Sequence, residues 1–279
     1  MENDQRTISF EFFPPKNAQA AERLAQTSAT LAELAPEFFS VTFGAGGSTR
    51  DNTLECVSNI SSATGIDVAP HLSCIGSTES SIRELLEVYQ SKGVKRIVAL
   101  RGDMPSGMRD PGEFNYANEL VEFIRKTTGD HFHIEVAAYP EFHPQARSAQ
   151  EDITNFKRKV DAGADSALTQ YFFNADAYFR LLDDCSAANI NIPIVPGIMP
   201  ITNYTQLARF SDACGAEIPR WIRRRLEGFG DDMESLRDFG TDIITELCGT
   251  LLEGDAPGLH FYTMNQTKAT LAIWRQLQG

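Results

Sequence analysis

The chain has 279 residues, of which 42% are hydrophobic and 23% are charged, a composition typical of a globular protein that buries a sizeable core. Its formal net charge of −13 argues against nucleic-acid binding, because a phosphate backbone would be repelled. The five cysteines form no Cys-x-x-Cys pair, and neither a signal peptide nor a membrane span is recognisable. We therefore expect a cytoplasmic protein with no membrane association and no thiolate metal site.

Short apolar runs alternate with longer amphipathic segments, a pattern that predicts strands joined by helices in a mainly parallel sheet. The predicted strands are 7–12, 38–42, 67–71, 96–100, 133–138, 166–170, 192–195 and 258–261. The predicted helices between them are 18–34, 53–64, 77–92, 115–127, 149–162, 175–188 and 203–213.

The predicted strand ends recur at intervals of about 30 residues, the length of one βα unit. The last interval is longer, and the segments 219–226 and 233–252 fill it with additional helices. Eight units predict an α/β fold, a closed (βα)8 barrel of the TIM type with extra helices before the last strand, and one domain over 1–279. The alternative is an open doubly wound sheet with a small helical second domain, although no Pro/Gly/Ser-rich linker marks a boundary.

Polar residues follow the apolar strand runs, at the positions that form the active site of such a barrel. They are Glu11, Thr42, His71, Arg101, Tyr139 and Gln170. The neighbours of Glu11 are Phe10, Phe12 and Phe13. Burial beside them would raise the pKa of Glu11 toward that of a useful general acid. The alternative is a salt-bridged carboxylate with a structural role.

Two further features each allow two interpretations. Gly102 would let a ligand approach the backbone between Arg101 and Asp103, whereas a turn with an ion pair is the alternative. His71 fits a ligand contact or a bond to a backbone carbonyl. His131 and His133 would share one face of a strand, but no third ligand with metal-site spacing accompanies them, so no metal site is predicted.

A basic segment in the fifth predicted helix offers an anion site. Asp152, Asn155 and Lys159 have the spacing i, i+3 and i+7 and therefore share one helix face. Together with Arg158 they would hold a diphosphate and hydroxyl groups. The alternative is an ordinary solvent-facing stripe.

Motifs in the same order along nearly the whole chain resemble the methylenetetrahydrofolate reductase family. They are FEFFPPK at 10–16, SVTFGAGG at 40–47, APHLSC at 69–74, LRGD at 100–103, AYPEFHP at 138–144, KRKVDAGA at 157–164, TQYFF at 169–173, VPGIMP at 195–200 and HFYTMN at 260–265. The resemblance implies FAD-dependent reduction of 5,10-methylenetetrahydrofolate to 5-methyltetrahydrofolate in one-carbon metabolism. NADH or NADPH would donate the electrons, and the nicotinamide and the folate would take turns over the flavin in a ping-pong mechanism.

The resemblance also implies roles for individual residues, with Glu11 as the general acid and Asp103 as a second catalytic residue. The implied cofactor contacts are Thr42, Phe43, Ala45, His71, Arg101, Gly102, Asp103, Ala117, Tyr139, His143, Ala146, Asp152, Asn155, Arg158 and Lys159. The implied substrate contacts are Asp103, Gln170, Gln206, Phe210 and Gln266. Thr42 and Gln170 would also reach the nicotinamide.

One position departs from the family pattern, because Gln266 follows the last motif where relatives commonly have Arg. This change weakens the expected charged contact to folate, and Lys268 is a candidate to compensate for it. We expect no regulatory domain after residue 279 and no allosteric control through one, and a homo-oligomer is compatible with the sequence. Two alternative functions remain, a flavin-independent transfer from nicotinamide to folate and a non-catalytic barrel that binds folate or flavin.

Overall fold

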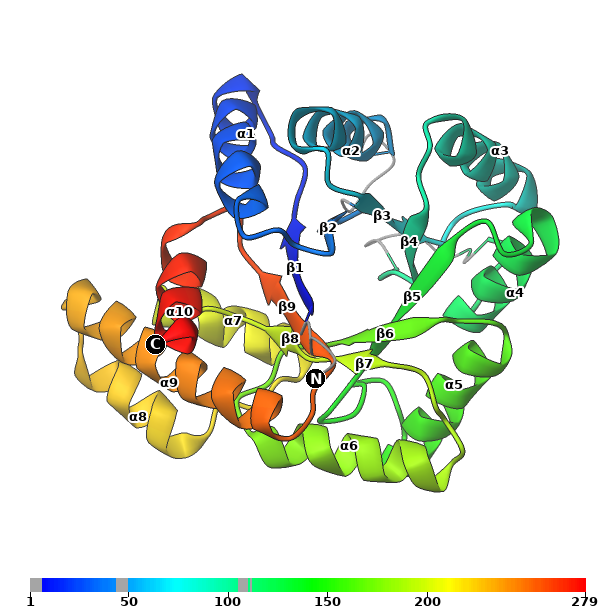
Figure 1. The fold of residues 1–279 in the computed structure, drawn as a ribbon. Coiled ribbons are helices and arrows are strands. Elements are labelled where there is room, and N and C mark those ends of the chain that lie inside the picture. The colour runs from blue at the N-terminus through cyan, green and yellow to red at the C-terminus, as the bar shows by residue number, and fades with distance from the viewer. Residues whose placement is uncertain (1–6, 44–49, 105–109, 111) are drawn as a thin grey trace, which may run out of the picture.

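The computed structural model describes residues 7–43, 50–104, 110 and 112–279, and it has parallel strands at the centre with helices around them (Figure 1). The strands are β1 (Thr7–Phe12), β2 (Phe38–Val41), β3 (Val68–Ser73), β4 (Arg96–Leu100), β5 (His133–Ala138), β6 (Ser166–Thr169), β7 (Ile194–Val195), β8 (Gly197–Ile198) and β9 (Gly258–Tyr262). The helices are α1 (Ala18–Ala32), α2 (Arg50–Thr64), α3 (Glu79–Ser91), α4 (Ala117–Thr128), α5 (Ala149–Asp161), α6 (Ala175–Ala187), α7 (Tyr204–Cys214), α8 (Arg220–Gly228), α9 (Met233–Glu253) and α10 (Lys268–Gln278).

The strands close into a barrel through an interrupted seventh strand. The sheet order is β7-β6-β5-β4-β3-β2-β1-β9-β8, and every pair is parallel. Pro196 separates β7, which pairs with β6, from β8, which pairs with β9. A proline cannot donate a backbone hydrogen bond, but its carbonyl accepts one from the His260 amide at 3.0 Å. The predicted (βα)8 barrel is therefore confirmed, with its seventh strand divided in two.

Close packing explains the residue that follows this proline. A Cβ atom on Gly197 would lie 2.2 Å from the Thr169 carbonyl oxygen and 2.6 Å from the ring of Tyr262. The barrel wall closes at this point only because the side chain is absent.

The predicted strand ends differ from the structure by at most two residues, except that the seventh prediction, 192–195, does not include β8. The extra helices before the last strand are confirmed as α8 and α9, and α9 packs against α10. The helix α10 was missing from the prediction. The helix α2 begins at Arg50 rather than at the predicted residue 53. Within the described part of the chain, no helix combines the length and apolarity needed to cross a bilayer.

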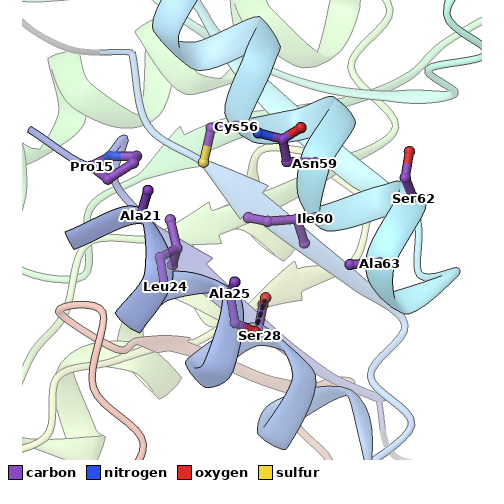
Figure 2. Close-up of a pocket in the computed structure, with 10 residues that line it drawn as sticks. All are labelled: Pro15, Ala21, Leu24, Ala25, Ser28, Cys56, Asn59, Ile60, Ser62 and Ala63. Atoms are coloured by element: carbon purple, nitrogen blue, oxygen red, sulfur yellow. Dashed lines mark hydrogen bonds between the residues drawn. The ribbon is translucent and has the colours of Figure 1, made fainter. Parts of the chain in front are cut away.

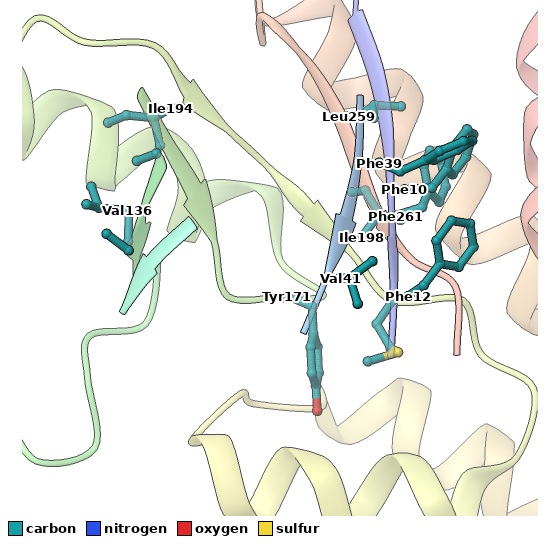
Figure 3. Packing of buried hydrophobic residues seen from close by; sticks show 14 of the residues in the cluster. Phe10, Phe12, Phe39, Val41, Val136, Tyr171, Ile194, Ile198, Leu259 and Phe261 are labelled. Carbon is teal, nitrogen blue, oxygen red and sulfur yellow. The ribbon is translucent and has the colours of Figure 1, made fainter. Parts of the chain in front are cut away.

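Side chains that alternate along each strand divide the apolar residues into two groups. The larger group fills the space between the barrel and the helices, where Phe10 packs against Phe39 and Phe261 with ring centroids about 6 Å apart (Figure 3). The side chains of the smaller group point to the opposite face of their strands and fill the barrel interior. This group consists of Phe38, Ala69, Val98 and Leu168. The remaining interior positions are therefore open to polar side chains.

One set of polar side chains lies at the amino-terminal end of the barrel. The carboxylate of Glu135 on β5 is only 1% exposed and pairs with Arg96 Nη1 on β4 at 2.6 Å. Its other oxygen accepts a 2.6 Å bond from the hydroxyl of Ser166 on β6, and that hydroxyl contacts Nε2 of His133 at 2.6 Å. Arg96 also pairs with Glu37. We call these five residues the Glu135 network.

Candidate functional site

Glu11 lies at the carboxyl end of β1, with its carboxylate near two histidines. Its Oε2 atom is 3.2 Å from Nε2 of His71 on β3 and 3.7 Å from Nε2 of His260 on β9. The Glu11 side chain is 17% exposed, whereas His260 is fully buried. Neither ring nitrogen has an aligned hydrogen-bond partner among the described residues. We call these three residues the Glu11 cluster.

The predicted increase in the pKa of Glu11 is wrong. Burial raises the pKa, but the charge of His71 and the polar contacts with His260 and His71 outweigh burial and lower it from 4.5 to about 2. Phe10 and Phe12 belong to the large apolar cluster, because alternation along the strand turns them away from the face that carries Glu11. Near neutral pH the Glu11 carboxyl group is therefore an anion beside two imidazoles.

The loop after β9 is fastened to the end of β1. The hydroxyl of Thr263 donates to the Glu11 carbonyl at 2.7 Å, and it accepts a bond from the Asn265 amide at 3.1 Å. The Asn265 side chain binds both the amide and the carbonyl of Phe13, at 3.0 and 2.9 Å. The backbone of Met264 and Asn265 has φ values of 52° and 55°, a left-handed conformation that residues other than glycine rarely adopt. These bonds fix the backbone that presents Glu11.

A second polar group lies around the start of α5. The Asp152 carboxylate accepts a bond from the His143 amide at 3.0 Å, and the His143 ring meets the Tyr139 ring edge-on at a centroid distance of 4.6 Å. Lys159, two helical turns after Asp152, donates its ammonium to the Ala137 carbonyl. The predicted shared face of α5 thus brings Lys159 next to the end of β5 and Asp152 next to the loop that follows it.

Burial disfavours the charged forms of the ionisable residues in this group. Burial lowers the pKa of Lys159 from 10.5 to about 8, although Asp152 partly opposes the change. Burial likewise lowers the pKa of His143 and raises the pKa of Asp152. Asn155 accepts a bond from the exposed Arg158 at 2.9 Å. The group therefore presents hydrogen-bond donors, and a bound anion would stabilise the charged form of Lys159.

The loop after β4 is held by hydrogen bonds and close packing, and among the described residues Arg101 forms no ion pair with Asp103, the alternative that the sequence left open. Arg101 donates to the Asn115 carbonyl at 3.0 Å and to Gln145 Oε1 at 2.8 Å. Gly102 has a φ of 82°, and a Cβ atom there would lie 1.8 Å from Oγ of Ser73. Gly102 is thus required by its own backbone and by β3, whether or not a ligand approaches it. Asp103 is exposed at the rim.

Candidate folate residues follow β6 and lie on α7. The side chain of Gln170 accepts a bond from the Tyr171 amide at 3.0 Å. The Tyr171 hydroxyl contacts Oγ of Ser211 on α7 at 3.1 Å and so ties this helix to the end of β6. Gln206 is exposed and Phe210 is half-buried, one turn apart on α7.

Tyr262 lies between the Glu11 cluster and this side of the barrel. Its hydroxyl donates to the Thr169 carbonyl at 2.6 Å, and its ring meets the Tyr171 ring at a centroid distance of 6.3 Å. Burial raises the pKa of Tyr262 well above its usual range, and the Glu11 charge adds to this effect. Tyr262 therefore remains a neutral donor.

The other predicted contacts are spread around the rim. Thr42 and Phe43 follow β2 and are half-buried, and Ala117 is the first residue of α4. Ala146 donates its amide to the His143 carbonyl at 2.8 Å. Gln266 is exposed after β9, and Ala45 lies outside the described residues.

Ser9, His260, Thr263 and Asn265 belong to the site but were missing from the prediction. A signal for His260 was present, because it lies in the last predicted strand and alternates with its neighbours, so its side chain shares the face of Tyr262 two residues later. The side-chain bonds of Thr263 and Asn265 depend on residues about 250 positions away, and no local pattern shows such contacts.

A pocket between α1 and α2 lies away from these side chains. Its volume is about 460 Å³, and α1 and α2 line it with small and apolar residues such as Leu24, Ala25 and Ile60 (Figure 2). It belongs to the helix layer and contains no member of the Glu11 cluster. In the described ranges, no three His, Cys, Asp or Glu side chains are grouped to hold a metal ion.

Comparisons with known proteins agree with the motifs. A family model described as methylenetetrahydrofolate reductase matches residues 1–278. The chain is 40% identical over 273 residues to the 5,10-methylenetetrahydrofolate reductase of Escherichia coli (strain K12), which covers 98% of this chain and 91% of that protein. It is 38% identical over 289 residues to methylenetetrahydrofolate reductase (NADH) 1 of Arabidopsis thaliana, covering 99% of this chain and 49% of that protein.

A solved structure supports the fold alone. An uncharacterized protein from Clostridium thermocellum, described as binding two copies of 5-methyl-5,6,7,8-tetrahydrofolic acid, superposes with a TM-score of 0.68 at 16% identity and covers 98% of this chain and 95% of its own. The family match and the identity to the curated reductases carry the functional assignment. The chain belongs to the methylenetetrahydrofolate reductase family and is an oxidoreductase with that activity.

Proposed function

We propose that this single-domain barrel reduces 5,10-methylenetetrahydrofolate to 5-methyltetrahydrofolate with FAD and NADH or NADPH in a ping-pong mechanism. The observation that supports this proposal most directly is the position of Glu11. It is a partly exposed carboxylate at the carboxyl end of the barrel, beside two imidazoles that lack aligned partners. Active sites of such barrels lie at this end.

The residues at the other side of the rim fit a flavin dinucleotide. Lys159 is a cation whose pKa burial lowers to about 8, and a diphosphate nearby would stabilise its charged form. Arg158, Asn155 and Asp152 continue along α5 and offer polar contacts for phosphate and hydroxyl groups. Bound FAD would supply the hydride, and Arg101, Tyr139 and His143 would orient it from neighbouring loops.

Glu11 would serve the folate half of the reaction. Opening the imidazolidine ring of methylenetetrahydrofolate requires a proton on the leaving N10, and a positioned carboxyl group can deliver it. Since the pKa of Glu11 is about 2, its protonated form is scarce near neutral pH, and bound substrate would have to raise this pKa by weakening the contacts of the carboxylate with the two histidines. Gln170 and Phe210 would hold the folate, and Asp103 would assist at the rim.

Anaerobic absorption spectroscopy tests this proposal. Purified protein should bind FAD stoichiometrically, lose its yellow colour when NADH or NADPH is added, and regain it when methylenetetrahydrofolate follows. Turnover by flavin-free protein would instead establish direct transfer from nicotinamide to folate. Binding of flavin and folate without any turnover would establish a non-catalytic barrel.

A further inference from the structure

The loop after β5 and the chain at the end of α7 are joined on the rim of the barrel. The Glu141 carboxylate, through Oε2, accepts a bond from the Glu217 amide at 2.8 Å. Gly215, the C-cap of α7, has a φ of 77°, and a Cβ atom there would lie 2.7 Å from the ring of Pro144. The crevice between the two segments has a volume of about 10 Å³, about the smallest that holds one water molecule. We call Glu141, Pro144, Gly215 and Glu217 the rim clasp.

Each side of the rim clasp carries residues that we assign to a different ligand. The loop after β5 carries Tyr139 and His143 on the flavin side, and the Asp152 carboxylate holds the His143 amide at 3.0 Å. The helix α7 carries the folate candidates Gln206 and Phe210. The rim clasp therefore joins a loop of the proposed flavin site to the helix of the proposed folate site.

Among the described side chains, the hydrogen bonds that tie α7 to the strand-end loops lie at its carboxyl-terminal half. The Tyr171 hydroxyl contacts Oγ of Ser211 at 3.1 Å, and the rim clasp follows it along the chain. At the other end of the helix, the Tyr204 hydroxyl donates to Glu227 on α8 at 2.7 Å. Leu207 is buried in the core, but apolar packing is non-directional. The direction of α7 thus depends on the bonds at its carboxyl-terminal half.

Glu141 acts in the rim clasp as a hydrogen-bond acceptor whose charge is only partly compensated. Burial raises the pKa of Glu141, and the nearby charge of Glu217 adds to this effect. The Glu217 amide and the charge of Arg180 on α6 oppose it. A neutral carboxamide offers the same acceptor oxygen without the repulsion between two carboxylates. Glutamine should therefore replace Glu141 in the rim clasp without loss.

We propose that Glu141 is a positioning residue for the folate half of the reaction. By holding the Glu217 amide it keeps the end of α7 against the loop after β5, so that Gln206 and Phe210 are aligned with the folate. This inference rests on the proposed function and deepens it, because it assigns the alignment of the two sites to a hydrogen bond that touches neither ligand. Alignment of this kind contributes to catalysis without any chemistry of its own.

The first test measures both half-reactions in Glu141→Ala. KM for methylenetetrahydrofolate should rise about tenfold, the usual cost of a hydrogen bond to a charged group, while kcat falls by no more than about twofold. Flavin reduction by the nicotinamide should be unchanged, because the predicted nicotinamide contacts Thr42 and Gln170 lie outside α7. Glu141→Gln keeps the acceptor oxygen and should stay within about twofold of wild type in every constant.

Glu113→Ala is the matched control, because Glu113 makes the same kind of bond elsewhere on the rim. Its Oε2 atom accepts a bond from the Glu79 amide at 2.6 Å and ties the loop after β4 to the start of α3. This helix carries none of the predicted ligand contacts. The control should lose stability in urea as Glu141→Ala does, but its KM for folate should match wild type. An equal increase of KM in both variants would mean a general loosening of the rim and would overturn the inference.

Labelling of Cys214 gives a readout independent of turnover. All five cysteines lie in the described ranges, and four are buried, whereas Cys214 is half-buried and lines the crevice of the rim clasp. Iodoacetamide should modify Cys214 about tenfold faster in Glu141→Ala than in wild type, because opening of the rim clasp uncovers the thiol. Glu141→Gln and Glu113→Ala should react at the wild-type rate. Mass spectrometry of the labelled peptides identifies the modified cysteine.

Glu141→Asp is the second variant if Glu141→Ala does not fold. Its carboxylate is one methylene short of the Glu217 amide, so KM and labelling should rise by smaller factors. Unchanged KM or unchanged labelling in the variant that folds would overturn the inference, as would Glu141→Gln behaving like Glu141→Ala. Wild-type protein that completes neither half-reaction would overturn the proposed function instead, and the labelling rates would still report on the rim clasp.

Discussion

The barrel holds a carboxylate beside histidine near each end, and the two are bonded very differently. At the amino-terminal end both Glu135 oxygens have partners at 2.6 Å, and the side chain is 1% exposed. At the carboxyl end Glu11 is 17% exposed, and its histidine contacts are 3.2 and 3.7 Å long without alignment. The pKa of each carboxyl group is lowered against the effect of burial.

This difference separates stability from function within one chain. A buried polar group without a good partner costs stability, whereas a fully bonded one holds its neighbours in place. The Glu135 network joins β4, β5 and β6. The Glu11 cluster retains unmet bonding capacity at the end where substrates enter such barrels. The lowered pKa alone does not distinguish the two sites, but the hydrogen-bond geometry does.

The largest expected effect is on the folate step of Glu11→Gln. Glutamine preserves size and polarity but cannot deliver a proton, so this half-reaction should slow by about 10²–10⁴-fold. Flavin reduction should continue, because hydride transfer from the nicotinamide needs no acid at the folate nitrogen. Rapid mixing of each half-reaction measures both rates. Equal slowing of the two steps, or an unimpaired folate step, would remove Glu11 from the acid role.

A substitution at the amino-terminal end of the barrel should change the free energy of unfolding rather than the reaction rate. Glu135→Gln removes the charge that pairs with Arg96 and His133, and breaking a buried pair in this way costs about 3 kcal/mol. The lower end of the usual range is expected, because Glu37 remains beside Arg96. Urea unfolding measures the loss. Turnover per folded molecule should match wild type, and a large loss of turnover would contradict the division between the two ends.

Lowering the pH should reveal how strongly the two histidines stabilise the ionised form of Glu11. Its pKa is lowered from 4.5 to about 2, so its ionised form stabilises the fold above pH 4.5 and loses this contribution as pH falls toward 2. The shift corresponds to about 3 kcal/mol. Free energies of unfolding measured in urea between pH 6 and pH 2 should therefore fall more steeply for wild type than for Glu11→Gln. Parallel curves would show that the histidines do not stabilise the anion.

Much of this comparison could be predicted from sequence, but its decisive part could not. Alternation and spacing place Glu11 and His71 at strand ends, and they correctly predict the barrel. They failed on the pKa of Glu11, because the result depends on the contacts of its carboxylate with His71 and His260, and these residues meet only in the closed barrel. The division of the seventh strand at Pro196 likewise follows from pairing on both sides rather than from local composition.

Lys159 offers a smaller test at the carboxyl end. Because its pKa is about 8, it carries a charge near pH 7 and loses it as pH rises through 8. Affinity for FAD should decline over the same pH interval. Because a bound diphosphate raises the pKa of Lys159, the interval will lie at a higher pH in the complex. Lys159→Met should weaken FAD binding about tenfold and abolish this pH dependence. Fluorescence titration measures both, with Lys157→Met as the control because Lys157 pairs with Asp161 instead. A retained pH dependence would contradict the role.

The smallest effect is expected where the family pattern is broken. Gln266 and Lys268 are both exposed after β9, and α10 begins at Lys268. A neutral amide cannot form the charged bidentate contact of an arginine, so we expect Lys268 to supply part of the missing attraction. Exposed charges contribute little, and Lys268→Ala should therefore weaken folate binding about fivefold or less.

Lys92→Ala is the control for this variant, since Lys92 is an exposed lysine at the end of α3, close in sequence to the amino-terminal start of β4. Folate binding to the FAD-loaded enzyme, followed by flavin absorbance, measures each variant, and added salt should shrink the Lys268 effect because it screens exposed charges. If Gln266→Ala weakened binding strongly while Lys268→Ala did not, the compensation would be wrong. The neutral amide itself would then be the folate contact, and this rim of the site would work through hydrogen bonds rather than charge.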